Sequence, residues 1–179
     1  MAWHGFGRTI LFGGLAAAGW PAVALLLRPI AAPGDALAIY LLAVASVYVA
    51  GLGASPRRAL GAGVLATFMS ACVLALAPDL GGVIAGAVAV LAIGRVRLFQ
   101  TGGLARTLAV EGIALSIGLL LARAIAGPDP MHVALALWAF FLPQSLYFLV
   151  GGVTTRRDPI EGLDPFDAAY HRAEALMDA

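Results

Sequence analysis

Charged residues are scarce in this chain. They make up 12% of its 179 residues, whereas 61% are hydrophobic; an ordinary soluble domain carries about 25% charged residues. The charges also cluster, which leaves uncharged runs long enough to cross a bilayer. A cleaved signal peptide would be followed by a soluble sequence, but here further apolar runs follow the first. The composition therefore excludes a soluble domain and predicts a polytopic membrane protein.

Groups that commonly carry chemistry are also few. The single cysteine, Cys72, lies inside an apolar run, which excludes an internal disulfide and a cysteine-based metal cluster. His4, His132 and His171 lie near three different chain ends or loops, so we do not expect them to share a metal ion. No segment matches a catalytic signature. The sequence thus predicts a protein that is not an enzyme and that has no catalytic residue, no cofactor and no metal site.

Six apolar segments organise the chain. Each has about the twenty residues that a helix needs to cross a bilayer, and the loops between them are very short. Consecutive helices are therefore expected to form three hairpins. The predicted fold is all-α, with a six-helix transmembrane domain over residues 1–153 and helices at about 9–27, 36–54, 59–77, 80–99, 104–125 and 131–153. In the fourth segment, the side chains of Arg95 and Arg97 would have to extend to the membrane interface.

The arginines predict the orientation of these helices. If the N-terminus is inside, only Arg28 and Arg123 fall on the outer side. This excess of inner arginines follows the positive-inside rule, and both termini are expected in the cytoplasm. The inner set is Arg8, Arg57, Arg58, Arg95, Arg97, Arg106, Arg156, Arg157 and Arg172.

The three outer turns resemble one another. They read "APGD" (32–35), "APD" (77–79) and "GPDP" (127–130). Aspartate is a good N-cap, and we therefore expect each aspartate to cap the helix that follows. A duplicated hairpin is the alternative explanation.

A polar tail follows the sixth segment over residues 154–179. It contains three arginines and six acidic residues. Phe166, Tyr170 and Met177 fall on one face of a predicted short amphipathic helix. Such an acidic helix suits a cytoplasmic protein partner better than anionic lipid; a frayed terminal helix without a partner is the alternative.

Glu111 is the acidic residue inside the run "ARTLAVEGIALSIGLLLAR" (105–123). It lies five residues, roughly 7–8 Å, beyond Arg106, within the inner third of the membrane. Arg106 is a poor partner on the same helix because it lies about 140° round the axis. We expect Glu111 to pair with Arg95, Arg97 or another inner arginine and so to join helices. A role in moving a proton or an ion is the alternative.

Pro143, Gln144 and Ser145 interrupt the sixth segment with polar groups. Proline leaves a carbonyl of the preceding turn without its hydrogen bond. Gln144 can satisfy such a group or bond to a neighbouring helix. We favour a locally stabilised bend over a helix that lines a solute cavity. Tyr48 and Trp138 are among the aromatic residues expected at the membrane interface.

The segment "SPRRALGAGVLATFMSACVLALAPDLGGVIAGAVAVLAIGRVRLFQ" (55–100) resembles the MreD family of rod-shape-determining membrane proteins in layout. The shared features are a Pro-Arg turn before a glycine-rich helix, a short outer turn followed by "LGG", and basic residues at the inner end. The resemblance implies a non-catalytic scaffold in the bacterial inner membrane. It also implies a single-span envelope protein as partner and, through it, the peptidoglycan synthases of cell elongation.

Two other functions remain open. MreD is similar to the substrate-binding components of energy-coupled vitamin transporters, which makes a small-solute transporter the main alternative. A transporter would gather several polar groups at one cavity near the midplane. An ion-conducting subunit of a respiratory assembly would need a relay of acids, for which Glu111 alone is too little. Partners are therefore expected to be lipid and other membrane subunits, not nucleic acid.

Overall fold

The computed structural model describes residues 5–53, 55–99 and 104–150. Over these residues the chain is all-helical, with six helices and no strand. The helices are α1 (Phe6–Leu27), α2 (Pro33–Gly51), α3 (Pro56–Leu76), α4 (Leu80–Phe99), α5 (Leu104–Ile125) and α6 (Pro130–Val150).

Three helices begin earlier than their apolar runs. The structure starts α1, α2 and α3 three residues before the predicted starts. Proline occupies the first turn of α2 and α3, as Pro33 and Pro56. A first-turn proline loses no intrahelical hydrogen bond, because that amide has no partner in a helix. Each of these helices therefore begins about one turn before its apolar run.

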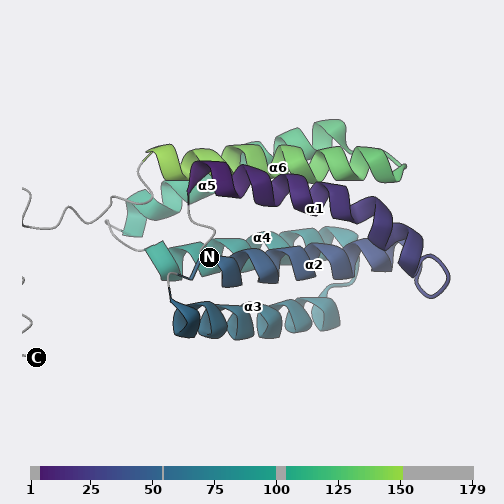
Figure 1. Cartoon of the computed structure of the whole chain (residues 1–179), viewed down its shortest axis with the longest axis horizontal. Helices are drawn as coiled ribbons and strands as arrows, with labels where there is room; N and C mark the ends of the chain where they lie inside the picture. Colours follow the sequence, from purple (N-terminus) through teal and green to yellow (C-terminus); the bar gives the residue numbers. More distant parts are fainter. Residues whose placement is uncertain (1–4, 54, 100–103, 151–179) are drawn as a thin grey trace, which may run out of the picture.

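The helices form two layers (Figure 1). In one layer α6 packs between α1 and α5, and in the other α2 packs against both α3 and α4. We call these the α1–α5–α6 layer and the α2–α3–α4 layer. The main chains approach each other across the layers where α1 meets α2 and, at fewer points, where α4 meets α5. Helix α3 lies at the outer edge of its layer.

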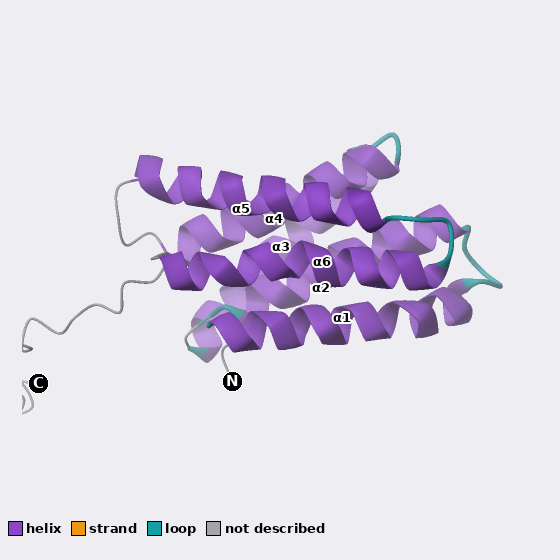
Figure 2. Cartoon of the chain, turned by 90° about the horizontal axis from the view of Figure 1, so that it is seen from above, coloured by secondary structure: helices purple, strands orange, loops and turns teal. Residues whose placement is uncertain are grey.

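The three turns with aspartate lie together at one end of the bundle (Figure 2). Two of the aspartates are N-caps, as predicted. Asp79 Oδ1 accepts a hydrogen bond from the Gly82 amide at 2.7 Å, and Asp129 Oδ1 accepts from the Met131 and His132 amides at 2.9 and 3.1 Å. The prediction for Asp35 was wrong: α2 begins at Pro33, so that Asp35 lies inside its first turn and Ala32 is the N-cap.

Asp129 makes the start of α6 sensitive to acid. The His132 amide, followed by the His132 side chain, holds the pKa of the Asp129 carboxyl below its ordinary value. A lowered pKa stabilises the fold above the unfolded-state pKa of about 3.9, and this contribution is lost as the pH falls through the folded-state value. We expect Asp129→Ala to lower the melting temperature at pH 7 and to lower it less at pH 3. Equal losses at both pH values would contradict the cap.

The outer surface of the bundle is apolar. Among its most exposed side chains are leucines, such as Leu26 at 73%, Leu60 at 72% and Leu76 at 81%. Five helices, α1 to α5, contain stretches long and apolar enough to cross a membrane, and α6 contains a shorter apolar stretch, Pro130–Leu146. Soluble proteins rarely expose so continuous an apolar surface to water. These helices are those of a membrane protein.

Candidate functional site

Buried polar side chains meet at the junction of the two layers. Thr9 of α1, Tyr48 of α2, Arg95 of α4, Glu111 of α5 and Gln144 of α6 form one hydrogen-bonded set, which we call the Arg95 cluster. Each of the five is at most 2% exposed. Because buried polar groups are unfavourable unless they are bonded, the cluster is the first candidate for a functional site.

Arg95 lies at the centre of this cluster. Its Nη1 donates to both carboxylate oxygens of Glu111, at 3.2 and 3.4 Å, and to Oε1 of Gln144. Its Nη2 donates to the Tyr48 hydroxyl at 2.9 Å. The guanidinium is always charged in proteins, and Glu111 is the acidic group paired with it. One long side chain from the α2–α3–α4 layer thereby binds two helices of the other layer.

Tyr48 connects Arg95 to the aromatic core. Its ring centre lies 5.1 Å from the Arg95 guanidinium carbon, which is within the range of a cation–π interaction. The same ring lies 5.1 Å from that of Phe12 and 5.4 Å from that of Phe141. The Tyr48 hydroxyl also lies 3.3 Å from Thr9 Oγ1. The aromatic rings thus close one side of the cluster with apolar surface.

Gln144 extends the cluster to the main chain of α5. Its Nε2 donates to the Ala114 carbonyl at 3.0 Å, while its Oε1 accepts from Arg95. Gln144 was predicted either to satisfy a main-chain group freed by Pro143 or to bond to a neighbouring helix. The structure shows the bond to neighbouring helices. Ser145 instead donates to Leu142 O of its own helix at 2.6 Å, and Pro143 is buried within α6.

The cluster lies toward one end of the bundle. Arg95 is four residues, about 6 Å, before the end of α4, and Glu111 is seven residues, roughly 10 Å, after the start of α5. Each of these helices is about 30 Å long. The ion pair is therefore displaced from the middle of the bundle toward the end opposite the three aspartate turns (Figure 2).

Within the described part of the structure, not every predicted residue belongs to this cluster. Arg97 is exposed on α4. Arg106 is in the first turn of α5, and its side chain lies outside the described part of the structure. The tail residues also lie outside it: Phe166, Tyr170 and Met177.

Two members of the cluster were missed by the sequence reasoning. Tyr48 was predicted to anchor at the interface, which was wrong because it is fully buried; Trp138, at 40% exposure, does face outward. Thr9 lies in the first turn of α1, where threonine is common and carries no signal. The available clue is that Tyr48 lies near the same end of the bundle as Arg95.

The cluster has the chemistry of a structural link between helices. Arg95 cannot give up its proton, and Glu111 is the one carboxylate among the five side chains. Within the described ranges, no three His, Cys, Asp or Glu side chains come together as metal ligands. No family model, curated protein or solved structure matches the chain. The resemblance to the MreD family stays a prediction.

Removing the Tyr48 hydroxyl tests the link between Tyr48 and Arg95. We expect Tyr48→Phe to lower the free energy of unfolding by about 1.5–3 kcal/mol, because it removes a hydrogen bond to a charged group. Tyr40→Phe is the matched control, since the Tyr40 hydroxyl donates to the neutral Ala16 carbonyl and its loss is expected to lower that free energy by about 1 kcal/mol. Thermal unfolding of both variants in one detergent measures the difference. Equal losses would contradict a special role for Tyr48.

Proposed function

We propose that the chain is a six-span protein of the bacterial inner membrane with both termini in the cytoplasm. Several observations support this topology. The apolar helices alternate in direction, and the arginine-poor aspartate turns gather at one end. Arg57, Arg58, Arg95 and Arg97 belong to the opposite end, which is the distribution that the positive-inside rule associates with the cytoplasmic side.

Within that membrane, we infer that the protein is a non-catalytic scaffold or accessory subunit of a cell-envelope complex, in cell-wall elongation and cell shape. The observation that carries this proposal is that the carboxylate and the side-chain amide inside the bundle are bonded to other helices. Glu111 and Gln144 both bind Arg95, and Gln144 also binds the α5 main chain. Groups used in this way hold helices in fixed positions. A scaffold needs such a rigid arrangement of helices. The resemblance to MreD supports a single-span envelope protein as partner.

A small-solute transporter, or the substrate-binding membrane component of one, is the second candidate. It is favoured by the convergence of polar side chains from five helices on one point. Against it, the cluster lies toward a helix end instead of near the midplane, where transporter sites usually form. In addition, two pockets of the structure, on the α3–α4 side, are lined by other residues. The scaffold therefore agrees better with the geometry.

Affinity purification in mild detergent, followed by mass spectrometry, separates the two candidates. A tagged six-span protein of unrelated function, produced at the same level, is the control for nonspecific recovery. The scaffold predicts specific recovery of a single-span envelope protein together with a peptidoglycan glycosyltransferase. Recovery of an ATPase module, or of an isolated chain that binds a small molecule, would overturn it in favour of transport.

A further inference from the structure

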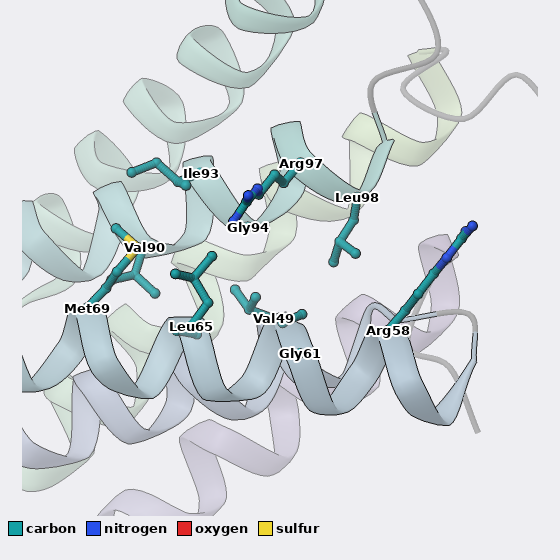
Figure 3. Close-up of a pocket in the computed structure, with 12 residues that line it drawn as sticks. Val49, Arg58, Gly61, Leu65, Met69, Val90, Ile93, Gly94, Arg97 and Leu98 are labelled. Atoms are coloured by element: carbon teal, nitrogen blue, oxygen red, sulfur yellow. The ribbon is translucent and has the colours of Figure 1, made fainter.

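An open groove runs between α3 and α4, away from the Arg95 cluster (Figure 3). Its volume is about 450 Å³. Val49 of α2 contributes to its wall, and Leu65 and Leu98 point between the two helices from opposite sides. The twelve lining residues are Val49, Arg58, Gly61, Ala62, Leu65, Ala66, Met69, Val90, Ile93, Gly94, Arg97 and Leu98.

Two arginines are the charged groups of this groove. Arg58 comes from the first turn of α3 and Arg97 from the last turn of α4, so both belong to the same end of the bundle. Both side chains are exposed. Among the described residues, the lining contains no acidic side chain. In Figure 3 the Arg58 side chain points outward past the end of α3, and the Arg97 side chain points back along α4 toward Gly94. The rest of the lining is apolar.

Small residues create the space in the groove. Gly61 and Ala62 of α3 and Gly94 of α4 are among its lining residues. A side chain at Gly61 would meet no atom within 4 Å of its Cβ. A second pocket, of about 370 Å³, continues the groove along the same two helices and shares Met69 with it. The two pockets thus follow one another along the surface of α3 and α4 and are open to the surroundings of the bundle.

The length of the groove matches one lipid leaflet. Met69 lies eleven residues after Arg58, or about 16 Å along α3. Half of the hydrocarbon core of a bilayer is about 15 Å thick. An acyl chain whose headgroup lies at the arginines would therefore have its end near Met69, at the junction with the second pocket.

We propose that this groove binds one anionic phospholipid of the leaflet at the arginine end. On binding, the exposed side chains of Arg58 and Arg97 turn toward the phosphate from the orientations seen in Figure 3, and an acyl chain lies along Leu65 and Val90 toward Met69. Charge complementarity and the apolar remainder identify the occupant, because a lipid supplies an anion and a long apolar chain in one molecule. An acidic peptide would match the arginines alone. The site is independent of the scaffold function proposed above.

Lipid binding to the purified full-length chain tests the proposal. Native mass spectrometry after delipidation measures adducts with phosphatidylglycerol and with phosphatidylcholine of the same acyl chains. We expect tighter binding of phosphatidylglycerol. Arg58→Gln combined with Arg97→Gln is expected to weaken that binding by roughly thirtyfold, from the usual contribution of two arginines near an anionic headgroup. Arg57→Gln is the matched control: it removes the same charge from the same helix end but does not line the groove, and we expect a change within about threefold.

A second variant tests the apolar half of the site. Gly61→Leu fills the groove without a clash at its Cβ and leaves both arginines in place. We expect it to fold and to lose most of the phosphatidylglycerol binding. Equal binding of the two lipids by the unmodified chain would overturn the proposal. So would unchanged phosphatidylglycerol binding in the double arginine variant or in Gly61→Leu, or equal losses in the double variant and Arg57→Gln. Competition by an acidic peptide with the same affinity would assign the arginines to a protein partner instead.

Discussion

Arg95→Met is expected to lower the free energy of unfolding by roughly 3–5 kcal/mol, the range for breaking one side of a buried ion pair. The substitution leaves the Glu111 carboxylate buried without its partner. It also removes the donor that Gln144 Oε1 and the Tyr48 hydroxyl share. We expect a large fall in membrane abundance as well, because a loss of this size approaches the total stability of many proteins.

The control for this prediction is Arg57→Met, which removes the same charge from an exposed position. Surface charges contribute little, so that variant should unfold within about 0.5 kcal/mol of the unmodified chain. Thermal unfolding in one detergent and quantification of the protein in membranes are the measurements. If Arg95→Met and Arg57→Met were equally stable, the Arg95 cluster would not hold the layers together.

Gly13→Ala is expected to destabilise the contact between α1 and α6. Helix α1 approaches α6 so closely at this point that a Cβ at Gly13 would lie 2.6 Å from the Phe141 Cβ. That atom is fixed to the α6 main chain and cannot move aside as the end of a flexible side chain would. The helices must separate, and overpacking of this kind costs about 1–3 kcal/mol. Phe141 would also shift against Phe12 and Tyr48.

Gly14 supplies the control for this substitution within the same turn of α1. A Cβ at Gly14 meets no atom within 4 Å. Because alanine favours helix over glycine by up to about 1 kcal/mol, Gly14→Ala should be neutral or slightly stabilising. Unfolding of the two variants under identical conditions compares them directly. A stable Gly13→Ala protein would mean that α1 and α6 are not as close as the structure has them.

The fold was largely predictable because hydropathy and turn residues are local properties. The apolar runs predict the helices, and the Pro-Asp turns predict where two of them begin. The pairing of helices was not predictable. Apolar residues surround most of each helix, as expected for segments in lipid, so no stripe tells which face packs. Close contacts such as Gly13 against Phe141 become visible only in three dimensions.

The candidate site was predictable in part for a physical reason. Glu111 and Gln144 are conspicuous because polar groups are unfavourable inside a membrane. Arg95, Arg97 or another inner arginine could have satisfied Glu111, and the choice of Arg95 over Arg97 depends on which side of α4 faces the other layer. Tyr48 and Thr9 gave no comparable signal, since both residue types are frequent near helix ends.

Arg95 and Arg97 of α4 have different expected roles, the first in the Arg95 cluster and the second in the lipid groove. Arg95 faces the interior and is fully buried, whereas Arg97 is exposed and lines the groove. The two positions lie two residues apart and therefore point about 200° apart around the helix. Substitution of Arg97 should accordingly change lipid binding with little change in stability, and substitution of Arg95 should do the reverse.

The expected role of the Arg95 cluster is to link the two layers of the bundle. Its most direct test is the unfolding free energy of Arg95→Met combined with Glu111→Leu, measured beside both single variants in one detergent. Replacing a whole buried ion pair by apolar residues is often neutral, unlike removing one partner. We therefore predict that the double variant recovers most of the stability lost by Arg95→Met. A double variant destabilised by the sum of the two single losses would contradict the claim.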